Sequence, residues 1–462
     1  MTASSRQWIH MVGIAGAGMS GIARILRERS YKVSGSDLQS NDITKRLKDL
    51  GIEIYRGHSS SNLKEGVDLL VVSSAVPEDN CEVVLARERN IPILKRGQML
   101  AELVKDSKNI AVAGAHGKTT TTSMIYVAFS DCGLDPTFIV GGQLQGSHLG
   151  AKLGGGEYSI VEADESDASF LELKPYIALI TNIEDDHLDY YKSFDNIQSA
   201  FKLFLEGVKP GGFAVAYGED ACIQKIKKEV NTKIITYGEG PSNDYYLRNW
   251  QPKGMGSKFE VYSQGKNLGD VELSIPGKHN AINAVATIAI AAEIGLDIER
   301  VKKAIKKFKG AKRRFQIIGQ KGGMTVVDDY AHHPTEIKAT ISAARACHNG
   351  RIVVIFQPHR YSRTSLLGRQ LGEAFAGADL VVITEIYAAG EKSIPGITGE
   401  VVYNAARNAG YNAVFVPEFE KIYDYLLENV RANDLIITMG AGDVWKLGSV
   451  LLDKLPGSVL EA

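Results

Sequence analysis

The sequence has few cysteines, no long apolar run and no segment that suggests export. Its four cysteines lie far apart and include no Cys-x-x-Cys pair: Cys81, Cys132, Cys222 and Cys347. This pattern argues against a disulfide framework or a zinc knot and suits a reducing compartment. The most apolar helix candidate, Ala281–Gly295, is shorter than the ~20 residues that a membrane span needs. Met1–Arg6 leads directly into a strand without the apolar core of a signal peptide, so we expect a cytoplasmic protein without membrane insertion.

Net charge is also nearly absent. The 53 lysines and arginines balance 54 aspartates and glutamates, which leaves a formal charge of −1 and no general attraction to nucleic acid or to an anionic membrane. The 44% hydrophobic and 23% charged residues are ordinary values for a globular protein. A chain of 462 residues is too long for one core, and we expect about two to four domains.

One stretch in the first third of the chain has the layout of a phosphate-binding loop. The apolar strand Asn109–Ala113 leads into Gly114-Ala115-His116-Gly117-Lys118-Thr119-Thr120, and a helix is predicted over Thr119–Ser130. Backbone N–H groups and the helix dipole would face a phosphate, Lys118 would add charge, and Thr119 would offer a hydroxyl to Mg²⁺. Val112 stands where the strict pattern has its first glycine, so we expect a tighter loop. A plain glycine-rich turn is the alternative, but the preceding strand and four consecutive threonines favour binding of a nucleoside triphosphate.

Two acidic runs follow two further apolar strands. Glu162–Asp167 ends the strand Tyr158–Glu162, and Asn182–Asp189 follows the strand Tyr176–Thr181. In an open parallel sheet the carboxyl ends of the strands share one edge, so both runs should meet the phosphate loop. A lone acidic run is usually solvated or caps a helix. Two of them beside a bound triphosphate indicate a divalent cation.

The N-terminal segment carries a second glycine-rich turn. The strand Trp8–Ile14 leads into Gly16-Ala-Gly18-Met-Ser-Gly21, and Asp37 lies about 20 residues further on, as in dinucleotide-binding units. The pattern predicts a Rossmann-like half that binds a diphosphate and leaves open which one. A nicotinamide-dependent oxidoreductase would use the same loop, although it leaves Lys118 and both acidic runs unexplained.

The alternation of predicted strands and helices along the chain predicts an α/β protein with three domains. A Rossmann-like N-terminal domain would span residues 1–107 and a central P-loop ATPase-type α/β domain residues 108–318, with a small β-meander at Asp244–Ile275. A Rossmann-like C-terminal domain would span residues 319–462, and polar residues again end its strands. No repeat of 20–50 residues is evident.

The polar residues of the C-terminal segment suit a second substrate. His332, Arg360 and Arg363 follow predicted strands, and arginine forks bind carboxylates through two parallel hydrogen bonds. Surface salt bridges would explain the two arginines equally well. His332 and its neighbour His333 are also candidate metal ligands, but no further ligand stands at a typical spacing from them. Arg314 could join Lys118 and Mg²⁺ in stabilising phosphoryl transfer.

Taken together, these motifs resemble those of the Mur ligases of peptidoglycan synthesis. The resemblance rests on Gly114–Thr121, Glu162–Asp167, Thr181–His187, Pro276–Asn283, Arg313–Phe315 and Asp328–Pro334. The stretch Gln357-Pro-His-Arg-Tyr-Ser-Arg-Thr364 and the glycine turn that ends at Gly21 narrow it to the alanine-adding branch. These motifs run from about residue 10 to residue 442, so the resemblance covers nearly the whole chain.

The resemblance implies an ATP-dependent ligase that acts in cell-wall biogenesis. Its substrates would be UDP-N-acetylmuramate and L-alanine, its intermediate an acyl phosphate and its by-products ADP and phosphate, with Mg²⁺ as the metal. We expect a monomer or homodimer that binds no nucleic acid. A sister branch adds a tripeptide to the same UDP-sugar, and a nucleotide-switch protein without ligase chemistry is a further alternative.

The resemblance also implies roles for individual residues. Catalysis would depend on Lys118, Glu162, His187 and Arg314, and Thr119, Glu162 and His187 would bind metal. ATP would contact Gly114, Ala115, His116, Gly117, Lys118, Thr119, Thr120, His279, Asn280, Asn283, Arg314 and Asp329. The UDP-sugar would contact Gly16, Gly18, Asp37 and Ser74, and the amino acid His332, Arg360 and Arg363. Lys202 occupies the helix on which sister ligases carry a carbamylated lysine, a modification that we do not expect in this branch.

Overall fold

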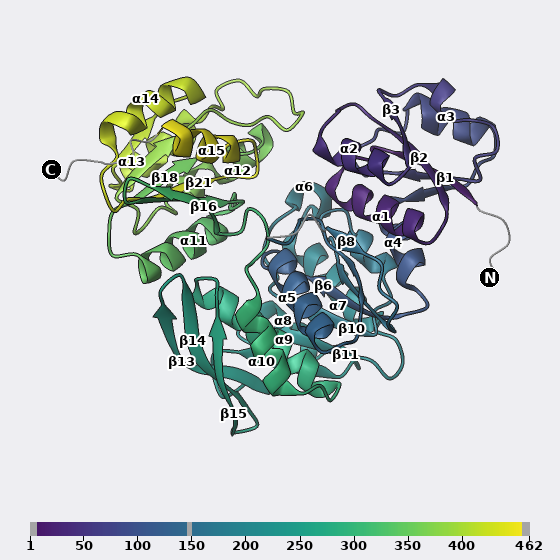
Figure 1. Ribbon diagram of the computed structural model, residues 1–462, viewed down its shortest axis with the longest axis horizontal. Helices are drawn as coiled ribbons and strands as arrows, with labels where there is room; N and C mark the ends of the chain where they lie inside the picture. The colour runs from purple at the N-terminus through teal and green to yellow at the C-terminus, as the bar shows by residue number, and fades with distance from the viewer. Residues whose placement is uncertain (1–6, 146–149, 455–462) are drawn as a thin grey trace. The chain divides into compact units, whose positions relative to one another are not determined.

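The computed structural model describes residues 7–145 and 150–454 of the chain (Figure 1). These residues form two compact units. Of the described residues, the first unit comprises 7–145, 150–248, 260–269 and 282–305, and the second comprises 249–259, 270–281 and 306–454. In the described part of the chain, every helix is too short or too polar to traverse a lipid bilayer.

The first of three sheets is fully parallel and has the strand order β3-β2-β1-β4-β5. Its strands are β1 Trp8–Val12, β2 Lys32–Asp37, β3 Glu53–Arg56, β4 Leu69–Val72 and β5 Ile93–Lys95. The helices are α1 Ala17–Glu28, α2 Asp42–Asp49, α3 Cys81–Glu88 and α4 Arg96–Val104, with a 3₁₀ turn η1 at Ser60–Asn62. The strand order reverses direction at β1, so the turn between β1 and α1 lies at the switch point where such sheets bind ligands.

The second sheet has ten strands in the order β15-β14-β13-β12-β11-β10-β6-β9-β7-β8. The strands are β6 Lys108–Ala113, β7 Thr137–Ile139, β8 Ala151–Lys152, β9 Tyr158–Glu162, β10 Ile177–Ile180, β11 Phe213–Tyr217, β12 Ile234–Gly238, β13 Tyr245–Lys253, β14 Gly256–Ser263 and β15 Lys266–Leu273. Its helices are α5 Lys118–Asp131, α6 Leu188–Tyr191, α7 Phe194–Glu206, α8 Ala221–Lys227, α9 Lys278–Glu293 and α10 Ile298–Lys307, with a 3₁₀ turn η2 at Ser169–Glu172.

β6 lies between β10 and β9 in this sheet, and all three strands run parallel. Ile110, Ala111, Val112 and Ala113 are fully buried, as expected for a strand that is covered on both faces. The phosphate loop and the two acidic runs therefore leave the sheet at one edge. The β-meander expected over Asp244–Ile275 is present as β13 to β15.

The third sheet lies in the second unit and has the order β16-β17-β21-β18-β19-β20. Its strands are β16 Gln316–Lys321, β17 Met324–Asp329, β18 Ile352–Phe356, β19 Leu380–Ile383, β20 Ala413–Phe415 and β21 Leu435–Met439. The helices are α11 Pro334–Cys347, α12 Tyr361–Gly372, α13 Glu400–Asn408, α14 Phe419–Asn429 and α15 Trp445–Lys454. Only the edge strand β16 is antiparallel among these described strands. Separate apolar clusters cover the two faces of the sheet.

The three sheets confirm the α/β fold class and the presence of three successive α/β domains. The boundaries at residues 107 and 318 stay a prediction. The outermost residues of the expected first and last domains, 1–6 and 455–462, lie outside the described part of the chain.

Candidate active-site residues

The phosphate loop has a backbone that only glycine adopts without strain at two positions. Gly114 has φ +129°, and a side chain there would collide with the hydroxyl of Thr181. Gly117 has φ +83° and caps the N-terminus of α5. A left-handed backbone favours glycine because it has no Cβ. The helix begins directly at Lys118, so its unpaired N–H groups and positive dipole end face the loop.

The residues that follow β10 hold this loop in shape. Thr181 donates from its hydroxyl to the carbonyl of His116 at 2.6 Å, and the Asn182 side chain accepts from the His116 N–H at 2.8 Å. The Ala115 N–H donates to the Asn182 carbonyl at 3.2 Å. The His116 ring lies 3.4 Å from a Glu184 oxygen. The second acidic run therefore supports the loop as well as adding charge beside it.

Lys118 is held as a cation against the loop. Its Nζ donates to the carbonyls of Gly114 at 2.5 Å and Ala115 at 3.1 Å, and to Glu165 Oε1 at 2.7 Å. Burial opposes the charged form, but the carboxylates led by Glu165 outweigh it and raise the pKa of Lys118 above its ordinary value. The ammonium group therefore stays charged at the position where phosphates would bind.

Glu162 meets the first turn of α5. The Thr119 hydroxyl lies 3.1 Å from both Glu162 carboxylate oxygens, and the Gly141 N–H donates to Oε2 at 3.0 Å. Burial raises the pKa of Glu162, and the Lys118 charge opposes that rise. A hydroxyl and a carboxylate in contact beside a phosphate loop are oxygen ligands of the kind that Mg²⁺ prefers.

Glu165 is a residue of this cluster to which the sequence motifs gave no role. It bridges Lys118 and His187, whose Nε2 lies 3.6 Å from Glu165 Oε1 and 3.6 Å from Asp186 Oδ2. Burial opposes the charged form of His187, while Glu165 and Asp186 outweigh it and raise the pKa of the imidazole. Within the described residues, the buried Oε2 of Glu165 has no hydrogen-bond partner. A buried carboxylate oxygen without a donor fits a site that takes a cation.

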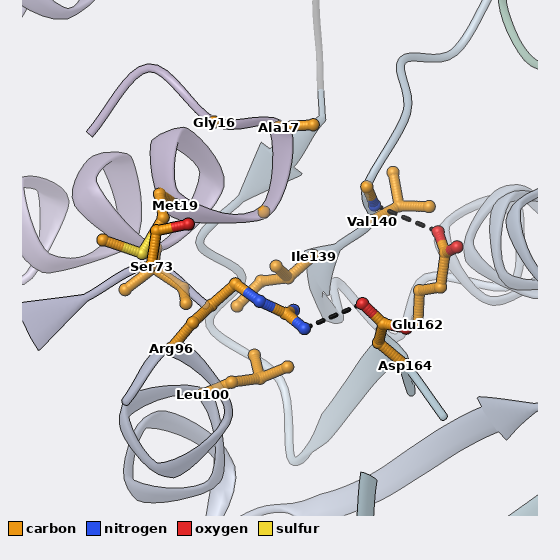
Figure 2. A pocket seen from close by; sticks show the side chains of 13 residues that line it. Gly16, Ala17, Met19, Ser73, Arg96, Leu100, Ile139, Val140, Glu162 and Asp164 are labelled. Carbon is orange, nitrogen blue, oxygen red and sulfur yellow. Dashed lines mark hydrogen bonds and ion pairs between the residues drawn. The ribbon is translucent and has the colours of Figure 1, made fainter. Parts of the chain in front are cut away.

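The residues expected to contact the UDP-sugar surround the turn after β1. Asp37 does not face a ligand freely, because its Oδ2 accepts from the Ala15 N–H at 2.9 Å and its Oδ1 from the Gln39 N–H at 3.0 Å. It thus shapes the glycine turn. Gly16 and Gly18 line a pocket of about 230 Å³ (Figure 2). Ser73 lines this pocket, whereas Ser74 is not among its lining residues.

The residues expected on the adenine side divide between the two units. In the first unit, a Cβ at Gly117 would lie 3.3 Å from Asn283 Oδ1, so Asn283 is next to the phosphate loop. In the second unit, Asn280 donates from its side chain to the Pro276 carbonyl at 2.7 Å, which satisfies an acceptor at the start of α9. His279 is exposed.

Arg314 and Asp329 take part in two different hydrogen-bond networks of the second unit. Arg314 donates to Glu336 Oε1 at 3.1 Å. The Asp329 carboxylate accepts from the N–H groups of Phe315 and Ala331 at 2.7 and 2.8 Å, and burial raises its pKa to about 6. Both backbone bonds fix Asp329 at the end of β17.

The residues expected to bind the amino acid also lie in the second unit. His332 Nδ1 lies 2.9 Å from the Tyr330 carbonyl and 3.2 Å from Glu336 Oε2. Both partners are acceptors, so Nδ1 carries the proton and Nε2 presents a lone pair. Burial lowers the pKa of His332 to about 4, which keeps the ring neutral at pH 7.

The two arginines of this set lie at the start of α12, just after β18. Arg360 is exposed, with φ +70° at the N-cap, and its N–H donates to the Tyr387 carbonyl at 2.9 Å. One turn later, Arg363 Nη1 lies 3.5 Å from the ring of His359, and that ring is 6.0 Å from the ring of His332. The structure therefore brings His332 and Arg363 together through His359.

Lys202, on α7, pairs with Glu229 at 3.0 Å and is partly exposed. This contact matches the expectation of an unmodified helix lysine. The modification state itself stays a prediction.

The chain is similar to known proteins over nearly its whole length. Models of the Mur ligase family match in three segments: its catalytic domain at residues 8–108, its middle domain at residues 112–291 and its glutamate ligase domain at residues 313–442. The chain is 65% identical over 458 residues to the UDP-N-acetylmuramate–L-alanine ligase of Syntrophomonas wolfei, covering 98% of both chains.

Two solved structures are similar over nearly the full length. The UDP-N-acetylmuramate-alanine ligase MurC from Thermotoga maritima matches with a TM-score of 0.84 at 31% identity, covering 97% of this chain and 99% of that one. A murein peptide ligase from Psychrobacter arcticus matches with a TM-score of 0.72 at 25% identity, covering 99% of this chain and 100% of that one.

Proposed function

Since the chain belongs to the Mur ligase family, we propose that it is the ATP-dependent ligase that joins L-alanine to the carboxylate of UDP-N-acetylmuramate. The observation that carries the chemistry is the contact of Lys118 with Glu165 and of Thr119 with Glu162 at the carboxyl ends of β6 and β9 in the second sheet. The reaction gives ADP and phosphate and supplies a precursor of peptidoglycan. A cytoplasmic location and the oligomeric state stay predictions.

The first chemical problem is that a carboxylate is a poor electrophile. Its charge repels nucleophiles, and its oxygen is a poor leaving group. Transfer of the γ-phosphoryl group of ATP gives an acyl phosphate, which the neutral amine of alanine attacks to form a tetrahedral intermediate that expels phosphate. The transfer requires two anions to approach each other, so the charge of Lys118 and the N–H groups at the start of α5 lower the barrier.

Thr119, Glu162 and His187 are the residues that we propose hold Mg²⁺. Glu165 lies beside them, with an unpartnered oxygen inside the same cluster. When bound, the metal supplies positive charge against the phosphate oxygens. The carboxylates need such a counter-charge because Lys118 forms its ion pair with Glu165, whereas Glu162 accepts from the Thr119 hydroxyl and the Gly141 N–H.

The second substrate is assigned to the residues after β17 and β18. Arg360 and Arg363 suit the carboxylate of the amino acid, because a guanidinium fork matches two carboxylate oxygens. The lone pair on His332 Nε2 suits an N–H donor, so we assign His332 to the amino group of the amino acid. This extends the expectation from sequence, in which His332 belongs to the set around the carboxylate.

The test of the proposed function is an assay of inorganic phosphate with ATP, UDP-N-acetylmuramate and a panel of amino acids. We expect phosphate release that requires all three substrates and is fastest with L-alanine. Faster release with the tripeptide that the sister branch adds would assign the chain to that branch. Release that does not depend on both co-substrates would favour a nucleotide switch.

Replacement of Arg360 should act mainly on the amino acid. We expect Arg360→Ala to raise the KM for L-alanine by about 10- to 100-fold, the loss typical of a hydrogen-bonded charge pair. The KM for ATP should change little. Arg369→Ala is the matched control, since Arg369 lies on the same helix and, among the described residues, pairs only with Glu373. Steady-state kinetics with each substrate varied will show whether the effect is confined to alanine.

A further inference from the structure

The pocket beside the glycine turn contains the guanidinium of Arg96, a cation that has no part in the function proposed above. The described residues that line it include Arg96, and every other charged residue of the lining is acidic, namely Glu162 and Asp164. Figure 2 shows the guanidinium of Arg96 lying between the start of α1 and the end of β9. If the pocket takes the UDP-linked substrate of the proposed function, it must hold the negative charge of a diphosphate next to two acids.

The guanidinium uses only part of its hydrogen-bonding capacity on the protein. Nη2 donates to Asp164 Oδ2 at 2.8 Å and to Ser169 Oγ at 3.2 Å. In residues 7–145 and 150–454, neither Nε nor Nη1 has a protein acceptor within hydrogen-bond distance. A Cβ placed on Gly18 would lie 3.3 Å from Nη1 and 3.8 Å from Nε. The unused edge of the guanidinium therefore faces the first turn of α1.

The position of Arg96 is fixed by the elements around it. Arg96 is the first residue of α4, and a side chain at Gly97 would collide with Ser169 at the start of η2. The absence of that side chain lets α4 approach η2 closely. The side chain of Arg96 is only 14% exposed. Its fork is therefore oriented by Asp164 and Ser169 before any ligand arrives, which lowers the entropic cost of binding.

We propose that Arg96 binds the diphosphate of the UDP-linked substrate and that Asp164 is the positioning residue that aims its guanidinium. This inference rests on the proposed function, which supplies the diphosphate. Two adjacent guanidinium N–H groups match two phosphate oxygens. The N–H groups at the start of α1 face the same anion, since the helix begins at Ala17. The assignment adds a charged contact to the glycines of this turn.

The test compares ligands that differ only in the diphosphate. We expect Arg96→Gln, which keeps much of the side-chain volume, to weaken UDP binding by about 10- to 100-fold, the range for hydrogen bonds between charged groups. Binding of uridine, which has no phosphate, should stay within about twofold of the unaltered chain. Calorimetry serves for UDP and ligand-observed NMR for uridine. Arg24→Ala, an exchange on α1 outside the pocket lining, is the control and should change neither affinity.

A purely structural role would give a different result. If Arg96→Gln weakens uridine and UDP equally, or weakens neither, the assignment to the diphosphate is wrong. Asp164→Asn should weaken UDP binding by a smaller factor, and this effect should vanish when Arg96 is already glutamine. An equal effect of Asp164→Asn in both backgrounds would overturn the positioning role.

The inference about Arg96 and the proposed ligase function can each fail while the other stands. Steady-state kinetics of Arg96→Gln should show a raised KM for UDP-N-acetylmuramate and an unchanged KM for ATP. If the unaltered chain releases no phosphate with all three substrates yet binds UDP through Arg96, the ligase function fails and the diphosphate site stands. If the unaltered chain is active and Arg96→Gln changes no UDP-dependent quantity, the function stands and this inference fails.

Discussion

Lys118→Ala is expected to lower the turnover number by about 10³-fold or more, the range reported for the loss of a cation that faces a transferring phosphoryl group. The ammonium group contacts two loop carbonyls and Glu165, at the start of the helix whose N–H groups face the phosphate loop. No other lysine or arginine of the described chain contacts Glu165, so nothing nearby replaces the lost charge. The measurement is phosphate release under saturating substrates, with binding of ATP alone as a second readout.

Loss of Lys118 also leaves Glu165 as a buried carboxylate without its cation, which costs about 3–5 kcal/mol in comparable buried pairs. A low activity could therefore reflect unfolding. Lys118→Ala/Glu165→Ala removes both charges, so we expect its melting temperature to recover while its turnover stays low. Lys227→Ala, an exposed lysine on α8 of the same unit, should behave as the unaltered chain. Near-normal turnover of Lys118→Ala would show that the phosphate loop is assigned wrongly.

The sequence was sufficient to predict which side chains lie at the carboxyl ends of the inner strands β6, β9 and β10 of the second sheet. Short apolar runs marked β6, β9 and β10, a glycine turn followed the first and acidic runs the other two, and the rule that ligands gather at strand ends placed Glu162 and His187 beside Lys118. This inference works because parallel topology converts order along the chain into position along one edge. The contacts of Thr119 with Glu162 and of Lys118 with Glu165 then follow from local geometry.

The elements that sequence did not predict have weak apolar patterns. α2 buries only Thr44 and Leu47 among its eight residues, and β3 is partly exposed along its whole length. An N-cap at Asn41, whose side chain accepts from two N–H groups, defines the start of α2 more clearly than hydrophobicity does. Such short polar elements depend on packing against a sheet that the sequence does not show.

The unassigned site residues were missed for a different reason. Glu165 lies in a run of four acids, and nothing in the run says which carboxylate meets Lys118. Arg96 begins a helix 66 residues before Glu162 in a different α/β domain, so its contact with Asp164 exists only after two sheets have packed within the first unit. Ser73 and Ser74 are adjacent and of the same residue type, so only the folded chain shows that Ser73 lines the pocket.

The second large effect is expected for Glu162→Gln, which should lower turnover by about 10²- to 10³-fold and shift the Mg²⁺ dependence to higher concentration. Glu162 accepts from the Thr119 hydroxyl and the Gly141 N–H. An amide keeps one acceptor oxygen but loses the charge that a divalent cation requires. The measurement is phosphate release across a titration of Mg²⁺, repeated with Mn²⁺.

Glu157→Gln is the matched control, because Glu157 directly precedes β9 and pairs with Lys108 at the opposite end of the strand from Glu162. Its metal dependence should equal that of the unaltered chain. The form of the loss then distinguishes two roles of Glu162. A raised Mg²⁺ requirement means that Glu162 binds the metal. A loss of turnover at an unchanged Mg²⁺ midpoint would contradict that role and mean that Glu162 acts through its contact with Thr119, by fixing the first turn of α5.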